Sequence, residues 1–188
     1  AREKLATFAD VFCEPGVFTL DETRAILESA RARGLKLKLH ADELEPSGGA
    51  ELAAELGATS ADHLAAISET GIAALASSNT VATLLPGTMF FLGRTRQAPA
   101  RALIESGAVV ALATDFNPGT SPTPNLPLIM TIGVSQLHMS VAEVLLATTV
   151  NGAAALGLAG STGQIASGFS ADVALSGVAG DIQQRAEH

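Results

Sequence analysis

The feature that most limits the possible folds of this chain is a repeated alternation of short apolar runs with helical patterns. Five such runs, each ending near a polar residue or a turn, cover residues 8–12, 35–39, 58–62, 81–85 and 109–113. Helical patterns follow them over 20–33, 49–56, 69–77, 99–106, 126–137 and 141–156. The repeat of about 23–30 residues predicts parallel β/α units. Two helix starts carry capping boxes, Thr19 with Glu22 and Ser140 with Glu143.

Five β/α units are fewer than the eight strands that close a barrel. We therefore expect an α/β protein with a partial (β/α)8 TIM-type barrel over residues 1–160. A doubly wound open sheet has similar spacing, and spacing alone does not separate the two. Residues 161–188 are predicted to be a remnant of a small accessory β-domain, with a strand at 171–175 and a polar tail from residue 178.

Charge and composition restrict the partners of the chain. The net charge of −8 argues against nucleic acid. No apolar run reaches the roughly 18–20 residues that span a bilayer, so we expect no membrane association. The single cysteine, Cys13, cannot form an internal disulfide; it favours a reducing, cytoplasmic compartment and is interpreted as a buried apolar residue. The chain begins without Met, and we expect it to come from a longer protein.

Three predicted strands end in groups suited to metal binding or proton transfer: His40, His63 and Asp115. Active sites in parallel β/α folds lie at these carboxyl ends, so we expect the three side chains to converge. Glu43 follows His40 closely enough to reach the same site, and Glu14 ends the first run. Imidazole and carboxylate groups bind metals such as zinc. His63 could donate to an oxyanion or accept a proton near neutral pH.

Each of these residues also has a structural interpretation. A backbone carbonyl could cap His40, His63 could be a loop residue beside Asp62, and Asp115 could close its strand through an Asx-turn. The N-P-G-T loop that follows Asp115 favours a functional role, because its amides and short polar groups suit a carboxylate-bearing ligand.

Five motifs give the sequence a resemblance to a known family. They are D-V-F-C-E-P-G-V-F from Asp10, K-L-H-A-D-E-L from Lys38, A-D-H-L from Ala61, L-L-P-G-T from Leu84 and T-D-F-N-P-G-T-S-P-T from Thr114. Together they are similar to imidazolonepropionase, a member of the amidohydrolase superfamily, over residues 9–175. The resemblance implies the C-terminal half of a barrel enzyme that hydrolyses the cyclic amide of 4-imidazolone-5-propanoate to N-formimidoyl-L-glutamate in histidine degradation.

The resemblance also implies roles for individual residues. His40 and Asp115 match metal-binding residues, with zinc or iron as the metal and Asp115 also catalytic. Glu43 matches a glutamate that holds the substrate ring and the attacking water, and His63 a histidine that assists the reaction. Positions that hold substrate or product match Asn117, Gly119 and Thr120. The full-length enzyme is expected to be a cytoplasmic homodimer.

The sequence departs from the family pattern in its metal ligands. The family carries an H-x-H pair on its first strand, and this sequence contains no H-x-H. His40 and Asp115 are fewer than the three protein ligands of a catalytic zinc, so we predict weak metal binding and little or no turnover by the chain alone. Two alternatives stay open. One is a purine or pyrimidine deaminase, against which the N-P-G-T-S-P-T loop argues; the other is an inactive half-barrel fragment with two unpaired strand edges.

Overall fold

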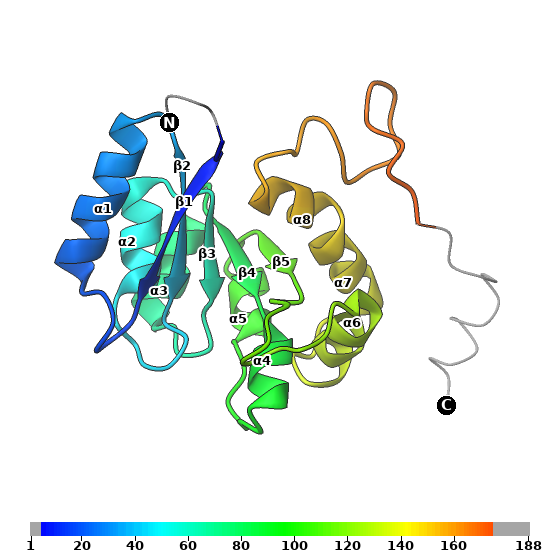
Figure 1. Ribbon diagram of the computed structural model, residues 1–188. Coiled ribbons are helices and arrows are strands. Elements are labelled where there is room, and N and C mark those ends of the chain that lie inside the picture. The colour runs from blue at the N-terminus through cyan, green and yellow to red at the C-terminus, as the bar shows by residue number, and fades with distance from the viewer. Residues whose placement is uncertain (1–4, 175–188) are drawn as a thin grey trace.

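The computed structural model describes residues 5–174, which form one parallel β-sheet with helices packed around it (Figure 1). The strands are β1 (Phe8–Cys13), β2 (Lys36–Ala41), β3 (Ser60–His63), β4 (Val81–Leu84) and β5 (Val110–Leu112). They lie in the order β1-β2-β3-β4-β5, and every neighbouring pair is parallel. A doubly wound sheet reverses its strand order at a switch point, and this sheet does not. The topology is therefore that of a partial barrel.

Eight helices lie within the described residues. They are α1 (Leu20–Ala32), α2 (Gly49–Leu56), α3 (Glu69–Ala76), α4 (Pro86–Phe91), α5 (Ala100–Glu105), α6 (Leu126–Ser135), α7 (Val141–Thr148) and α8 (Val150–Ala155). Both predicted capping boxes form, at the starts of α1 and α7, and confirm the two helix starts. None of the helices within residues 5–174 has the length and apolar character needed to cross a membrane.

Two helices differ from the sequence-based prediction. No helix was predicted between β4 and residue 99, but Pro86 is the first residue of α4, where its fixed φ fits a helix and its missing N–H costs nothing. The predicted helix over 141–156 is broken at Thr149, whose backbone (φ −120°, ψ −87°) is not helical. The Thr149 hydroxyl donates to the carbonyl of Leu145 at 2.6 Å, which stabilises the break by binding back into the preceding turn.

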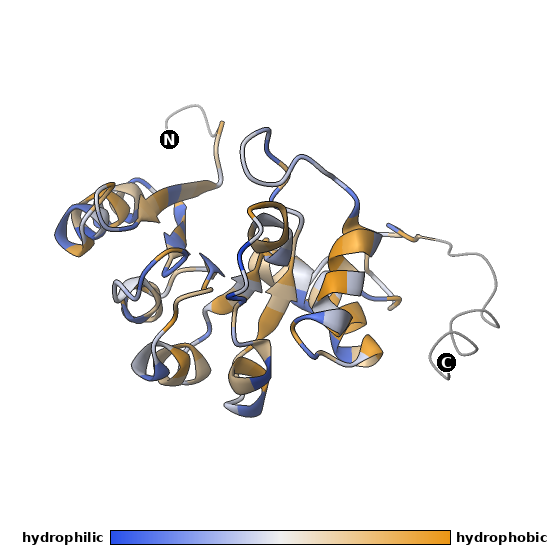
Figure 2. Cartoon of the chain, turned by 90° about the horizontal axis from the view of Figure 1, so that it is seen from below, coloured by the Kyte–Doolittle hydropathy of each residue, from blue (hydrophilic) through white to orange (hydrophobic). Residues whose placement is uncertain are grey.

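The two faces of the sheet are covered differently. Figure 2 shows helices along the outside of an open arc of strands, and apolar side chains on that outer face of the sheet form the main core. On the inner face, Ala155 of α8 covers Val81 and Ala111 in β4 and β5. The inner face of β1 to β3 instead carries the polar side chains of Asp10, Lys38, His40 and Asp62 beside those of Phe8 and Phe12. The polar part of the inner face therefore leads toward the strand ends that carry His40 and His63.

The strand predicted over 171–175 does not form in residues 171–174, the part of it that the structure describes. Residues 171–174 are neither helix nor strand, and Leu175 and the predicted polar tail lie outside the described residues. A strand needs a neighbour that pairs with its backbone groups, and residues 161–174 form only a loop that a hydrogen bond from Ser170 N–H to the Ser161 carbonyl closes at 2.7 Å. The assignment of residues 161–188 to an accessory β-domain stays a prediction.

Candidate active site

The structure brings His40, Glu43, His63 and Asp115 together at the carboxyl ends of the strands. The rings of His40 and His63 have their centroids 5.1 Å apart. Oε1 of Glu43 lies 3.6 Å from Nδ1 of His63. Asp115, which follows β5, is near enough to contribute to the pKa shifts of both histidines and of Glu43. Two imidazoles and two carboxylates thus share one rim of the sheet.

His40 lies in β2 with its side chain on the inner face, opposite Phe12 in β1 and Asp62 in β3. Its Nδ1 is 2.8 Å from Oδ2 of Asp10, a contact that becomes an ion pair when the imidazole is protonated. The interaction with Asp10 raises the pKa of His40, while burial opposes the shift. An acidic partner at Nδ1 favours the tautomer whose free lone pair is on Nε2, as in metal-binding histidines.

Asp10 was not predicted as a site residue, although it begins the D-V-F-C-E motif. Its relation to His40 depends on the register between β1 and β2, in which Asp10 and the residue opposite His40 lie on the same face. The signal in the sequence was an acidic residue inside an otherwise apolar run, two positions before Phe12. Such a residue is unfavourable in a buried strand unless it has a polar partner.

His63 ends β3 with a positive φ of 79°, and its side chain is only 4% exposed. Burial lowers the pKa of His63 to about 4, and the nearby His40 adds to the shift. The imidazole is therefore neutral at pH 7. Its Nδ1 has no hydrogen-bond partner among residues 5–174. A neutral ring with an unused polar atom is suited to donate a hydrogen bond to a ligand, and poorly suited to act as a base near neutral pH.

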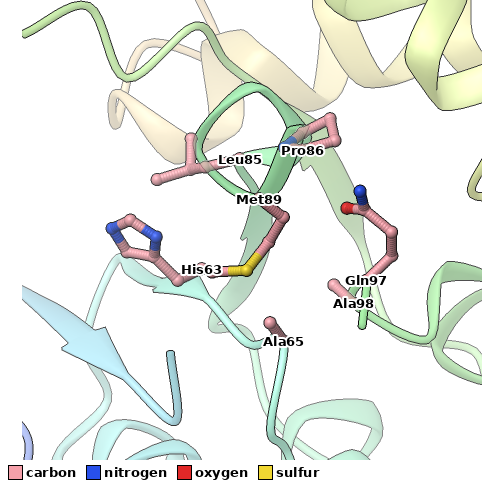
Figure 3. A pocket seen from close by; sticks show the side chains of 7 residues that line it. All are labelled: His63, Ala65, Leu85, Pro86, Met89, Gln97 and Ala98. Atoms are coloured by element: carbon pink, nitrogen blue, oxygen red, sulfur yellow. The ribbon is translucent and has the colours of Figure 1, made fainter. Parts of the chain in front are cut away.

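A small hollow borders His63 on the side of α4 (Figure 3). Besides His63, the side chains that line it are Ala65, Leu85, Pro86, Met89, Gln97 and Ala98. The lining is mostly apolar, and the hollow has no room for a water molecule. This hollow is therefore too small to hold a substrate.

Glu43 lies in the loop after β2 and is 9% exposed. Burial raises the pKa of Glu43, the negative charge of Glu14 raises it further, and His40 opposes the shift. Its backbone N–H donates to Oε1 of Glu14 at 2.6 Å. A carboxyl group with a raised pKa beside an imidazole can both hold and release a proton.

Asp115 has a positive φ of 50° three residues beyond β5. Its Oδ2 accepts a hydrogen bond of 2.6 Å from Oγ1 of Thr88, a fully buried residue of α4. Thr88 was missed as a site residue because α4 was not predicted, although the L-L-P-G-T motif contains it. The contact orients one oxygen of Asp115 and leaves the other available to a ligand.

The loop after Asp115 is held together by Asn117. Its Oδ1 accepts hydrogen bonds from the N–H groups of Gly119 and Thr120, both at 2.8 Å, and its Nδ2 donates to the carbonyl of Asp115 at 2.8 Å. The Asx-turn considered at Asp115 thus forms around Asn117 instead. The three residues predicted to hold substrate lie beside Asp115, and their polar groups bond to one another within the loop.

Two residues of this rim have side chains of the kind that bind metal ions. No group of three or more His, Cys, Asp and Glu side chains within residues 5–174 is arranged to hold a metal ion. His40 and Asp115 provide an imidazole and a carboxylate, which are donors that zinc and iron accept. The two residues are fewer than the three protein ligands that a catalytic zinc takes.

The sequence pattern of the amidohydrolase family matches residues 11–184. The chain belongs to the amidohydrolase family. This amidohydrolase is 52% identical over 183 residues to an imidazolonepropionase of Geobacillus thermodenitrificans, and the match covers 97% of this chain and 43% of the relative. It is 54% identical over 171 residues to an imidazolonepropionase of Bacillus velezensis, covering 91% of this chain and 41% of the relative. The chain thus spans about two fifths of the length of these relatives.

Solved structures of low sequence identity share the fold of this amidohydrolase. An adenosine deaminase from Xanthomonas campestris, solved with bound zinc, has a TM-score of 0.72 at 20% identity. The match covers 89% of this chain and 42% of the deaminase chain. A mutant atrazine chlorohydrolase from Arthrobacter aurescens, solved with zinc and atraton, has a TM-score of 0.65 at 16% identity, with 86% of this chain on 40% of that one. The likeness confirms the partial barrel fold.

Proposed function

We propose that this chain is part of an imidazolonepropionase, which hydrolyses the cyclic amide of 4-imidazolone-5-propanoate to N-formimidoyl-L-glutamate in histidine degradation. The observation that carries the proposal is the gathering of His40, Glu43, His63 and Asp115 at one rim of the sheet. The identity of 52% to an imidazolonepropionase supports this substrate. The likeness to an adenosine deaminase is one of fold, so we favour the imidazolone over a purine or pyrimidine.

His40 and Asp115 are proposed to be two ligands of a zinc or iron ion, and the remaining ligands come from outside the described residues. When bound, such an ion lowers the pKa of a water molecule so that hydroxide is available near neutral pH. Asp10 would hold the ring of His40 in position, and Thr88 would do the same for the carboxylate of Asp115. Both contacts fix the ligands before the ion binds, which favours binding.

Glu43, His63 and Asp115 are proposed to be the catalytic residues of the hydrolysis. Asp115 accepts a proton from the attacking water and returns it to the ring nitrogen as the carbon–nitrogen bond breaks. His63 donates a hydrogen bond to the amide oxygen as negative charge develops there, a role that its neutral state at pH 7 supports. Glu43 holds the substrate ring and the attacking water beside His63.

The loop formed by Asn117, Gly119 and Thr120 is proposed to hold the substrate or product. The hydrogen bonds of Asn117 set the shape of the loop, so a ligand meets a preformed surface next to Asp115. We further propose that the complete enzyme is a cytoplasmic homodimer.

The test uses a chimera in which this chain replaces the matching 43% of the Geobacillus thermodenitrificans relative. We expect the purified chimera, loaded with zinc or iron, to convert 4-imidazolone-5-propanoate to N-formimidoyl-L-glutamate, followed by mass spectrometry. Guanine, adenosine and cytosine are offered in parallel. Asp115→Asn keeps the size of the side chain and removes its basicity, and we expect it to lower kcat by about 100-fold or more.

A folded, metal-loaded chimera that does not hydrolyse the imidazolone would contradict the proposal, and so would either of two more specific outcomes. One is a folded, metal-loaded chimera that deaminates a base or nucleoside and leaves the imidazolone intact. The other is a chimera in which Asp115→Asn retains full activity.

A further inference from the structure

We infer that Glu14 is a positioning residue for Glu43, an inference that rests on the proposed function and deepens it. Glu14 directly follows β1, and the residue is only 1% exposed. Its Oε1 accepts a hydrogen bond of 2.6 Å from the backbone N–H of Glu43, and its Oε2 accepts one of 3.3 Å from the N–H of Leu44. A side chain at one strand end thus holds the backbone that carries a catalytic carboxylate at the next.

The carboxylate of Glu14 is buried without a cation beside it. None of the ion pairs found within residues 5–174 includes Glu14. Burial raises its pKa, and the hydrogen bonds from the Glu43 and Leu44 amides oppose the shift. A carboxylate taken out of water without a cation is unfavourable unless its lone pairs are used. An apolar side chain would fill the same space at a lower cost, so the contacts to the two amides account for a carboxylate at this position.

The other end of the same loop is held separately, by Asp42. This buried residue has a positive φ of 49°; its Oδ1 accepts from the N–H of Ser47 at 2.7 Å and its Oδ2 from the N–H of Ala50 at 2.9 Å. These contacts fix the loop where α2 begins, and they do not involve the amide of Glu43. Within the described residues, Glu14 accepts the hydrogen bonds of the Glu43 and Leu44 amides, while the carbonyl of Asp42, in the peptide before Glu43, accepts from the N–H of Ala66 at 2.6 Å.

The position of Glu43 matters because its carboxylate works at short range. Its Oε1 lies 3.6 Å from Nδ1 of His63, and a substrate ring held by Glu43 has to meet both His63 and Asp115. A displacement of about 1 Å in a reacting group can lower the rate about 100-fold. The aim of a loop carboxylate depends on the hydrogen bonds that hold its backbone, and at the amides of Glu43 and Leu44 these come from Glu14.

Glu14→Gln in the chimera tests the inference. Glutamine keeps the size of the side chain but presents an NH₂ group, a donor, to one of the two N–H groups. We expect kcat to fall about 10-fold to 100-fold, with a smaller change in KM. If Glu14 acts through Glu43, the same substitution has no further effect on kcat in the Glu43→Gln background. A loss of general stability would lower the amount of active enzyme equally in both backgrounds.

Amide hydrogen exchange on the full 188-residue chain gives a second readout that does not depend on activity. Glu14→Gln is expected to speed exchange at Glu43 and Leu44. Asp42→Asn is the matched control: it also removes a buried carboxylate from this loop, and it is expected to speed exchange at Ser47 and Ala50 instead.

An equal effect of Glu14→Gln in both backgrounds would overturn the inference, and so would unchanged exchange at Glu43 and Leu44. If the unsubstituted chimera shows no hydrolysis, the proposed function fails instead, and the exchange rates alone decide whether Glu14 holds the loop.

Discussion

At the scale of single residues, the two histidines of the site have opposite environments although their rings lie 5.1 Å apart. Asp10 favours the charged form of His40, whereas burial and the proximity of His40 favour the neutral form of His63. The pKa of one imidazole is therefore raised and that of the other is lowered. Such a difference between neighbouring groups is how a site assigns separate roles to identical side chains.

We predict that the two histidines titrate on opposite sides of the usual histidine pKa of 6.5. In the metal-free chain, NMR should show His63 neutral down to about pH 5, with its pKa at about 4. His40 should have a pKa above 6.5, so that it takes up its proton first as the pH falls. Asp10→Asn should lower the pKa of His40, because it removes the acidic partner. A pKa near 6.5 for His63 would contradict the buried position assigned to it.

The residue types of the site could be predicted from the sequence because His40, His63 and Asp115 each follow an apolar run, and strand ends are where such sites form. The partners Asp10, Glu14 and Thr88 could not be paired with them in the same way. Each reaches its target from a different strand or helix, so the contact depends on strand register and on the helix α4 that the sequence did not reveal.

At the scale of elements, local signals and tertiary contacts decide different features. The capping boxes at Thr19 and Ser140 act within four residues, and both helix starts agree with the sequence. The break at Thr149 is different, because the apolar pattern continues through it. After the break, α8 turns toward the inner face, where Ala155 packs on Val81 and Ala111. That apolar contact joins α8 to strands far away in the sequence, so the local pattern of residues 141–156 does not predict it.

Gly49 at the start of α2 is predicted to be required for the packing of α2 on β2. A Cβ at this position would lie 2.9 Å from Cβ of Ala41 and 3.1 Å from its Cα, and no side-chain rotation relieves either contact. Alanine is a better helix former than glycine by about 1 kcal/mol, but overpacking of this kind costs about 1–3 kcal/mol. Gly49→Ala should therefore lower the free energy of unfolding, measured in urea. Gly160→Ala is the control, since nothing lies within 4 Å of its added Cβ.

The link between α5 and α7 is predicted to depend on pH. Arg101 bonds to Glu143 at 2.7 Å and 3.1 Å, and together with the Ser140 cap it lowers the pKa of Glu143 from 4.5 to about 2. A lowered pKa in the folded state stabilises the protein above pH 4.5, and this contribution is lost as the pH falls toward 2. Acid unfolding of Glu143→Gln should show a weaker pH dependence in that window. An unchanged slope would mean that this partly buried pair contributes nothing to the free energy of unfolding.

At the scale of the whole molecule, the chain is a sheet with two free edges, β1 and β5, within the described residues. The chain matches about two fifths of the length of its relatives. We therefore expect the strands that complete the barrel to belong to the part of those relatives that this chain does not match. A site at the rim of a partial barrel holds only the ligands that its own strands carry. His40 and Asp115 are therefore expected to bind metal well only in the complete barrel.

We predict that the chain alone retains little zinc after dialysis, whereas the chimera retains about one ion per barrel, because catalytic zinc takes three protein ligands. Metal content measured by mass spectrometry tests both, and His40→Ala in the chimera should lower it. Full zinc content in the isolated chain, lost in His40→Ala, would show that two ligands suffice here.

The direct passage from β4 into α4 has a consequence for how this rim can diversify. Thr88 lies in a helix that begins just after a buried strand. Its hydrogen bond to Oδ2 of Asp115 therefore holds that oxygen against a rigid part of the fold. The segment from Phe116 to Thr120 is mostly on the surface and bonds chiefly to itself. Replacing residues 116–120 by a different segment should change which small molecule binds, while the carboxylate of Asp115 keeps its orientation.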